Sequence, residues 1–487
     1  MSSETEKQES IIFSPAFWAV MLGIFSIIHL FLGARRIKTS STTRNFVTNA
    51  PCGILEGIRR LGDTKGPTFL LEMMGQCGSE IFKLRLPIKH GGMFIVGDPK
   101  AAREILLDSD TEKPRQIYRS FDNATKGKTI FTRTNKDMMW HHARKGSNPA
   151  FSSSEVKRLT RICNQRLVDW VESTLEPCIA KNETFDPSEE MARLLFYTIM
   201  EVGFEYTMED AEYQLVSKAL EVTLTEFVFK QGANPLREIF GLLIPSRRRA
   251  HRAANDLNYF MSKVLKSYRE KKDKSPNNTI IKLIVGNPEY KSDGERVSEL
   301  LFFIIAGHDT TAYQISSILV LLAKHPEVAD KLRIDLARLD SSEWSKSDYL
   351  RFVISESSRL VPVAAMGSVR TAGRDFSFKD GAVKVPKGAI IALPQLLLNW
   401  NQDTFPNPDK FDPERWASPT QTAKEALMPF SLGKRNCIGQ RLATTELYSC
   451  VPMLLSKYKF EVVEEGELIY FLTYKYQGAR LRAARFE

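Results

Sequence analysis

The distribution of apolar positions divides the chain into an N-terminal apolar run and a long body. Residues 11–32 are mostly apolar, and as a helix they would span about 33 Å, enough to cross a bilayer. The segment before this run is acidic and the one after it is basic, which favours a cytosolic body. We expect a lumenal leader at 1–10, a transmembrane anchor at 11–32 and a polar tether at 33–50. A cleaved signal peptide is the alternative, and the acidic leader argues against it.

Within the body, 51–487, residues 81–86 alternate between apolar and polar positions, and residues 93–96 form a short apolar run after Gly91 and Gly92. They predict two strands joined by a turn. From about residue 99 to 359, apolar positions recur at helical spacing, and extended pieces return at 383–392 and in the last 30 residues. The pattern predicts a mainly α fold with a minor β-sheet region.

One apolar stretch, 301–322, is long enough to be a second membrane span. It carries Gly307, His308 and Asp309 near its centre, and an acidic group at the middle of a bilayer is costly. We therefore expect a helix buried on all sides within the body.

Composition limits the possible classes of protein. The chain of 487 residues is 43% hydrophobic and 26% charged, which excludes a disordered or low-complexity protein. The 68 Lys+Arg against 58 Asp+Glu leave a net charge of +10, compatible with nucleic acid, an anionic membrane or an acidic partner. No aromatic interleaving or recognition motif accompanies the charge, so we expect no nucleic-acid binding. The six cysteines form no C-x-x-C pair, which favours a reducing compartment.

The candidate chemistry lies in the segment 430–439, FSLGKRNCIG. Cys437 precedes a predicted helix, whose N-terminus favours a thiolate. Gly433 and Gly439 allow the backbone to approach closely, Arg435 can pair with a carboxylate, and Phe430 can shield the sulfur. A lone thiolate suits haem iron better than zinc, which takes further ligands. For a cysteine taken alone, a buried inert thiol is the alternative.

This segment resembles the haem loop of the cytochrome P450 family, the haem-thiolate monooxygenases, whose pattern F-x-x-G-x-R-x-C-x-G it matches at every fixed position. The resemblance implies the P450 fold, with haem b bound through an axial thiolate from Cys437. It implies a microsomal-type enzyme in the endoplasmic reticulum membrane, single-pass, with its catalytic domain cytosolic. The implied reaction inserts one atom of dioxygen into a small hydrophobic substrate such as a sterol, fatty acid or terpenoid.

The resemblance also implies a separate source of electrons. NADPH-cytochrome reductase is the expected partner, or a ferredoxin-type donor. The chain has no Gly-rich dinucleotide fingerprint after a strand, which agrees with electrons arriving from another protein. Two other interpretations stay open, a haem-thiolate hydroperoxide isomerase or dehydratase and a non-catalytic haem- or lipid-binding protein.

Further motifs follow the order of the family. Glu356 and Arg359 match E-x-x-R and share a helix face, and Arg415 lies in the matching P-E-R-W segment. The resemblance implies a structural network of these three residues.

The segment 306–311, AGHDTT, matches the family's [AG]-G-x-[DE]-T-T. A glycine inside a helix costs about 1 kcal/mol, so Gly307 suggests that something approaches the backbone there. By resemblance, Thr310 hydrogen-bonds dioxygen and Asp309 feeds protons inward. A helix kink with satisfied polar groups is the alternative.

Trp140 and Arg144 match W-x-x-x-R, and the resemblance implies that both contact haem propionates. Arg370 is expected as another propionate partner, with a surface role as its alternative. We interpret His141, His142 and His308 as neighbours of the site and not as iron ligands.

The resemblance also places the walls of the substrate pocket, in segments that are mostly apolar. They are the stretch 117–131 with Phe121, the helix around Phe227, Ala306, the stretch 361–366 ending at Met366, and the final hairpin near Phe471.

Two basic sets offer candidate contacts. Residues 247–274 carry ten Lys+Arg against three acids, which indicates a solvated helix face or a surface for anionic membrane lipid. Lys145, Lys157, Arg158 and Lys434 lie on segments that resemble the proximal side of the haem. We expect this second set to dock an acidic reductase.

Overall fold

The computed structural model describes residues 47–231, 236–239 and 241–486. The expected leader, anchor and residues 33–46 of the tether lie outside the described residues. Within the described part, no helix combines the length and apolarity that a membrane crossing needs.

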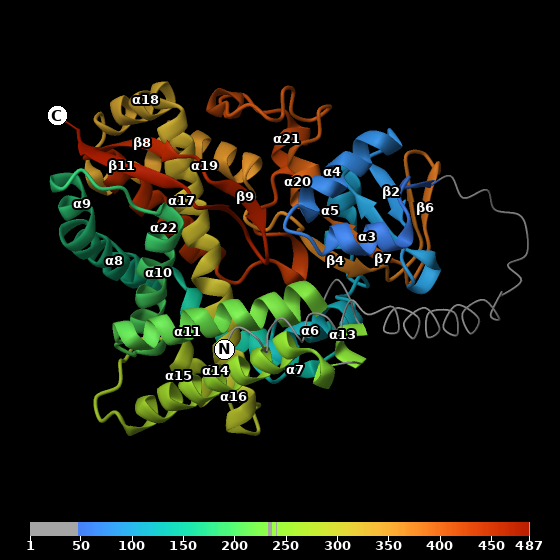
Figure 1. The fold of residues 1–487 in the computed structure, drawn as a ribbon, viewed down its shortest axis with the longest axis horizontal. Helices are drawn as coiled ribbons and strands as arrows, with labels where there is room; N and C mark the ends of the chain where they lie inside the picture. The colour runs from blue at the N-terminus through green and yellow to red at the C-terminus, as the bar shows by residue number, and fades with distance from the viewer. Residues whose placement is uncertain (1–46, 232–235, 240, 487) are drawn as a thin grey trace, which may run out of the picture. The chain divides into compact units, whose positions relative to one another are not determined.

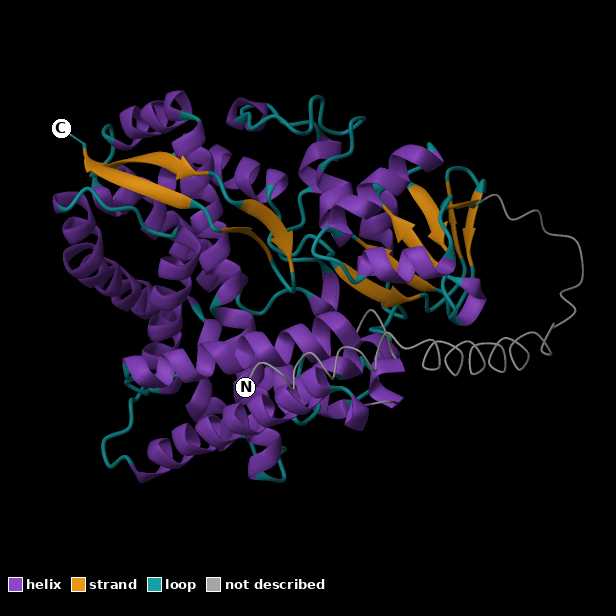
Figure 2. Ribbon diagram, viewed as in Figure 1, coloured by secondary structure: helices purple, strands orange, loops and turns teal. Residues whose placement is uncertain are grey.

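A five-stranded mixed sheet occupies one side of the described body, where Figure 2 shows most of the strands. Its order is β1–β2–β3–β7–β4, with the bounds β1 (Thr48–Asn49), β2 (Ile81–Leu84), β3 (Met93–Val96), β7 (Ile390–Leu393) and β4 (Ser368–Thr371). The two strands predicted near the N-terminus are β2 and β3, which pair antiparallel. β7 joins β3 in parallel, so segments distant in sequence build one sheet.

The short strand β1 corrects the expected start of the body. Thr48 and Asn49 pair in parallel with Phe82 and Lys83 of β2, and the Ala50 amide donates to the Lys83 carbonyl at 2.9 Å. Residues 48–50, expected in the tether, therefore belong to the sheet, because their backbone groups complete its edge.

Three two-stranded pairs complete the β structure of the described residues. They are β5 (Phe376–Phe378) with β6 (Val383–Val385), β8 (Tyr458–Glu464) with β11 (Arg480–Arg485), and β9 (Glu467–Tyr470) with β10 (Tyr474–Gln477).

Helices make up most of the described body (Figures 1 and 2), which confirms the prediction of a mainly α fold with a minor sheet. The helices before the central pair are α3 (Ile54–Leu61), α4 (Gly66–Cys77), α5 (Pro99–Leu107), α6 (Arg115–Thr125), α7 (Met138–Ser147), α8 (Ser153–Trp170), α9 (Glu176–Ala180), α10 (Pro187–Phe204), α11 (Asp210–Thr223), α13 (Leu236–Ile239), α14 (Pro245–Glu270) and α15 (Ile280–Gly286). Those after it are α18 (Pro326–Leu336), α19 (Asp348–Leu360), α20 (Gln395–Asn399), α21 (Gln421–Ala426) and α22 (Gln440–Leu455). A π-helical segment, Leu224–Lys230, continues α11.

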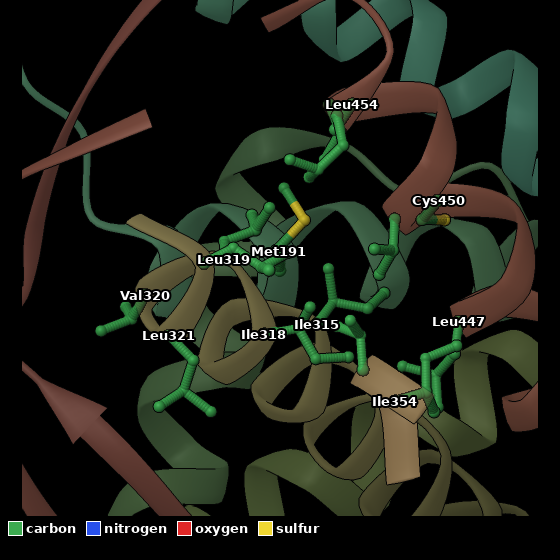
Figure 3. Packing of buried hydrophobic residues seen from close by; sticks show 14 of the residues in the cluster. Met191, Ile315, Ile318, Leu319, Val320, Leu321, Ile354, Leu447, Cys450 and Leu454 are labelled. Carbon is green, nitrogen blue, oxygen red and sulfur yellow. The ribbon is translucent and has the colours of Figure 1, made fainter. Parts of the chain in front are cut away.

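The central helix is two helices, α16 (Asp293–Gly307) and α17 (Asp309–Lys324), separated at His308. Every residue from Thr311 to Leu322 is buried, so the expectation of a helix enclosed by the body is confirmed for this part of 301–322, whereas Ala306 is exposed. Figure 3 shows Ile315, Ile318 and Leu319 of α17 packed with side chains of α10, α19 and α22. Each such side chain contributes about 1.5–3 kcal/mol when fully buried.

A buried ion network joins α19 to the segment before α21. Arg359 donates to both carboxylate oxygens of Glu356 at 2.8 Å, and both side chains are fully buried. Glu356 also accepts from Arg415 and from the indole of Trp416, each at 2.9 Å. The rest of the Arg359 guanidinium donates to three backbone carbonyls, those of Asn399, Pro408 and Lys410. The arrangement satisfies both charges and ties distant loops to one helix.

We predict that Arg359→Gln lowers the free energy of unfolding by about 3–5 kcal/mol, because it leaves the buried Glu356 charge without its main partner. The matched control is Arg351→Gln on the same helix, whose exposed i,i+3 pair with Asp348 contributes about 0–1 kcal/mol. Denaturant unfolding of both variants measures the difference. Equal losses in the two variants would show that burial does not govern the contribution of Arg359.

Candidate active site

Cys437 lies in the loop between a 3-10 turn, Gly433–Arg435, and the start of α22, as the sequence predicts. Its amide donates to the Phe430 carbonyl at 2.9 Å. From α7, the Arg144 guanidinium donates to the Asn436 carbonyl at 2.9 Å and to the Asn436 side chain at 2.6 Å. The Cys437 side chain itself is exposed, so the loop is held from two sides while its thiol is presented.

The two glycines of the loop differ in what they require. Gly433 has a φ of +71°, and a Cβ there would lie 2.5 Å from the Leu106 carbonyl oxygen. Gly439 has a φ of −83°, and a Cβ would approach Cys437 Sγ and Phe151 only to 3.9 Å. The predicted close backbone approach is therefore present at Gly433, whereas at Gly439 neither the backbone angle nor the surrounding space requires a glycine.

Opposing effects act on the Cys437 thiol. Desolvation by the surrounding chain raises its pKa above the ordinary value, whereas the amides of Gly439 and Gln440 at the start of α22 and the charge of Arg144 act to lower it. The helix N-terminus therefore acts in the expected direction, and metal binding would further favour the thiolate.

Four residues expected near the haem gather around this loop. Trp140 and Arg144 both lie on α7, and Arg435 stacks over the Trp140 ring at 4.5 Å. Arg435 also donates to the Arg133 carbonyl, and the buried Arg370 donates to the Val369 carbonyl at 3.0 Å. Arg370 is thus not on the surface.

The three guanidinium groups of this cluster have no carboxylate partner among the described residues. Burial lowers the pKa of Arg144 and of Arg370, and burial with the charges of Arg370 and Arg144 lowers that of Arg435 to about 9. One nitrogen of Arg435, Nη1, is buried without a hydrogen-bond partner in the described chain. Charges arranged in this way are complementary to an anion.

Lys113 is a fourth cation at this place, and the sequence motifs did not reveal it. Its ammonium group donates to the Phe131 carbonyl at 3.0 Å and lies 3.4 Å from the Phe131 ring centre. Burial, together with the charges of Arg435 and Arg370, holds its pKa well below the ordinary value. Lys113 precedes Pro114 in a segment without periodicity, so no sequence signal distinguishes it from a surface lysine.

This donor set fits a haem. A haem iron takes an axial ligand from the protein, which the exposed thiol can provide. The propionates of the haem need cationic partners, which the unpaired guanidinium groups can provide. Elsewhere in the described residues there is no group of three or more His, Cys, Asp or Glu side chains that could hold a metal ion. His141 and His142 face the Asn135 carbonyl and Glu289, in agreement with their interpretation as neighbours.

One face of the central helix is accessible at its break. Ala306 is exposed and Thr310 is half-buried, whereas Phe303 to Ile305 and Thr311 to Leu322 are buried. The Thr310 hydroxyl donates to the Ala306 carbonyl at 3.0 Å, and the Asp309 carboxylate pairs with His308 at 2.8 Å. Asp309 and Thr310 are thus adjacent in sequence but not bonded to each other. A Cβ on Gly307 would make only ordinary contacts.

Aromatic side chains line up beside this face. The Phe131 ring lies 4.9 Å from that of Phe121 on α6 and 5.0 Å from that of Phe302 on α16. Phe121 and Phe131 belong to the stretch expected as a pocket wall, whereas Phe302 was missed although it lies one helical turn before Ala306. Met366 is half-buried against the cluster formed by β2, β3 and α4.

The structure does not bring Phe227 to an accessible surface. Its side chain is fully buried and faces His251 of α14 with ring centres 4.8 Å apart. Phe229, two residues later, instead packs on Phe471 at 5.5 Å, the hairpin residue expected at the pocket. Both phenylalanines lie in the π-helical segment Leu224–Lys230.

Comparison with known proteins identifies the class. Residues 58–473 match the family model of cytochrome P450, and the chain belongs to that family. It is 27% identical over 387 residues to cyclooctat-9-en-7-ol 5-monooxygenase of Streptomyces melanosporofaciens, covering 76% of this chain and 80% of the relative. It is 26% identical to cytochrome P450 monooxygenase acrF of Aspergillus aculeatus, covering 76% and 82%, and 27% identical to cytochrome P450 4F5 of Rattus norvegicus, covering 66% of each.

The protein is therefore a cytochrome P450 monooxygenase, and its cofactor is haem with a cysteine thiolate as axial ligand.

We predict that Gly433→Ala destabilises the protein and lowers its haem content, because an alanine at positive φ costs about 1–2 kcal/mol before the contact with the Leu106 carbonyl is counted. Gly439→Ala is the matched control in the same loop, and its free energy of unfolding is expected to stay within about 1 kcal/mol of the parent. Denaturant unfolding and the ratio of haem to protein absorbance measure both effects. A larger loss in the Gly439 variant would contradict the different demands assigned to the two glycines.

Proposed function

We propose that Cys437 supplies the axial thiolate and that Trp140, Arg144, Arg370 and Arg435 hold the propionates of haem b. The observation that carries this proposal is an exposed thiol beside buried guanidinium groups with no carboxylate partner in the described chain. Gly433 brings the loop against the Leu106 carbonyl, Phe430 anchors the Cys437 amide, and Gly439 precedes α22. When bound, the haem supplies the chemistry that reduces dioxygen and transfers one oxygen atom.

We further propose that Thr310 and Asp309 manage protons at this site. The Thr310 hydroxyl lies on the accessible face beside Ala306, where it can donate a hydrogen bond to dioxygen once it leaves the Ala306 carbonyl. The Asp309 carboxylate is the nearest acid in sequence, and after a side-chain rotation that takes it away from His308 it can accept a proton and pass it to Thr310 Oγ1. Both residues together favour a monooxygenase over a hydroperoxide isomerase, which needs no proton delivery from the chain.

The substrate is proposed to be a small apolar molecule. The rings of Phe121, Phe131 and Phe302 supply apolar contact area next to Ala306. Two relatives are named for different molecules, a cyclooctat-9-en-7-ol and, in the taurochenodeoxycholic 6 alpha-hydroxylase of Sus scrofa, a taurochenodeoxycholic compound. Sterols, fatty acids and terpenoids are the proposed classes, because each presents an apolar surface to such rings.

We propose attachment to the endoplasmic reticulum membrane through residues 11–32, with the body in the cytosol. The apolar run and the basic residues after it support this proposal. On α14, Arg248, Arg249 and Arg252 are candidates for contact with anionic lipid, because their side chains face outward, whereas Arg247 is buried and donates to Gln231 at 2.6 Å. The basic face is therefore smaller than the sequence count suggested.

Activity is tested by reconstitution with NADPH-cytochrome reductase and isotope-labelled dioxygen, using dodecanoic acid, progesterone and geraniol as probes. We expect one labelled oxygen atom in the product of at least one probe. Asp309→Asn is expected to slow product formation about 100-fold or more, the contribution of a positioned general acid, without changing the haem spectrum. Turnover of a fatty-acid hydroperoxide without NADPH, and no NADPH oxidation with any probe, would favour the isomerase.

A second prediction concerns the electron donor. Lys145, Lys157 and Lys434 are exposed, whereas Arg158 is engaged with Glu155 at 3.0 Å. We expect Lys434→Glu to slow reduction by the reductase several-fold at low salt and less at high salt, because the attraction between exposed charges is screened. The matched control is Lys266→Glu on α14, where no donor is expected to dock. Equal slowing by both variants, or a changed haem spectrum, would contradict docking at Lys434.

A further inference from the structure

The carboxylate of Asp309 is bound by the residue before it. His308 Nε2 lies 2.8 Å from Asp309 Oδ1, and His308 Nδ1 lies 2.9 Å from the Ile304 carbonyl oxygen. A neutral imidazole has one donor nitrogen and one acceptor nitrogen, whereas an imidazolium has two donors. A carbonyl oxygen and an ionised carboxylate can only accept. The ring must therefore donate from both nitrogens and carry a positive charge when Asp309 is ionised.

Two further groups approach the same carboxylate. Tyr313, one turn later on α17, acts on Asp309 to lower its pKa, and Lys475 on β10 donates to the Tyr313 hydroxyl at 3.2 Å. The lysine occupies an acceptor position of that hydroxyl and leaves its proton free for another acceptor. The ring of Tyr313 lies 4.6 Å from the same ammonium group.

The remaining groups around this cluster come from α10, the segment before it and α11. Phe196 covers the His308 ring edge-to-face at 4.8 Å and is fully buried. Tyr213 lies near Asp309, and burial raises its pKa to about 12, so it is neutral. The charge of Asp186 acts to raise the pKa of Tyr313, and the charge of Arg193 acts to lower the pKa of Tyr213. His308 and Lys475 are thus the cations that act on Asp309 directly.

The directions of the pKa shifts agree with this geometry. Burial acts to lower the pKa of His308, but the charge and hydrogen bond of Asp309, with the Ile304 carbonyl, raise it above the ordinary value. Burial acts to raise the pKa of Asp309, but His308, Lys475 and Tyr313 together lower it.

We propose that His308 carries a positive charge that, with Tyr313 and Lys475, holds Asp309 ionised and turned away from Thr310. His308 is then a positioning residue, and Asp309 must leave this arrangement to reach Thr310, whose hydroxyl bonds the Ala306 carbonyl instead. The consequence for catalysis rests on the proposed role of Asp309 in proton delivery. The inference that His308 is charged does not depend on that role and can be tested separately.

The first test is an NMR titration of the holoprotein in its diamagnetic carbon monoxide form, with isotope-labelled histidine and His308→Gln to assign the resonance. We expect His308 to titrate above the ordinary value of about 6.5, and Asp309→Asn to lower that midpoint. A midpoint at or below the ordinary value in the parent protein would overturn the proposal. This readout needs neither substrate nor reductase.

The second test is the pH dependence of thermal unfolding. Because the folded-state pKa of His308 is raised, its contribution to stability is complete below about pH 6.5 and is lost as the pH rises through the folded value. We therefore expect His308→Gln to lower the Tm more at about pH 6 than at about pH 9. The matched control is His325→Gln, a partly exposed histidine 3.3 Å from Glu327, with little change at either pH. An equal loss at both pH values for His308→Gln would contradict the proposal.

The third test reads the catalytic consequence. In the reconstituted system, His308→Gln and Lys475→Gln should each move the acid limb of the pH profile of NADPH oxidation toward higher pH, because each removes a cation that keeps Asp309 ionised. For His308→Gln we expect a shift of about one pH unit, which is a tenfold change in the proton affinity of Asp309. Lys324→Gln is the control on the same helix as Asp309. An unmoved limb with a raised His308 midpoint would refute the positioning role, while no NADPH oxidation by the parent would refute the proposed function instead.

Discussion

Buried positive charge without a carboxylate partner in the described chain is the constraint on which the site depends. Lys113 and Arg370 are buried and Arg435 is half-buried around one loop, and an uncompensated buried ion costs roughly several kcal/mol. The network of Glu356 and Arg359 shows the contrasting case, because it satisfies its own charges. The Glu356 network therefore stabilises the fold by itself, whereas we propose that the charges of the other cluster are balanced by the anionic cofactor.

The central helix combines a buried half with a break that carries polar side chains. Its C-terminal half, α17, is buried along most of its length and packs against three helices (Figure 3), which fixes its position in the core. The helix is interrupted at Gly307 and His308, and the polar residues at the break point in two directions. Thr310 bonds back to Ala306 on the accessible face, and Asp309 turns to His308. Packing thus fixes the position of α17, and at the break Thr310 and Asp309 form hydrogen bonds in different directions.

Local signals in the sequence predicted the parts of the site that depend on short-range geometry. The cysteine loop, the strands β2 and β3 and the buried central helix follow from fixed spacings and periodicity, and each is present. The membership of β7 in the sheet, Lys113 in the cation cluster and the pairing of Asp309 with His308 depend on long-range contacts or side-chain orientation, which periodicity does not encode. The full burial of Phe227 was not foreseen either, because the resemblance that placed its helix at the pocket gives no orientation of the side chain.

Cys437 as the haem ligand is the assignment from which the roles of all the other site residues follow. The most direct measurement is the carbon monoxide difference spectrum of the reduced holoprotein, compared with Cys437→Ala and with Cys450→Ala, a buried cysteine on the following helix. We expect a Soret band at the red-shifted position of a thiolate-ligated haem in the parent and the Cys450 variant, and its loss in the Cys437 variant. A band at the position of a histidine-ligated haem in folded parent protein, or persistence of the thiolate band in Cys437→Ala, would contradict the assignment.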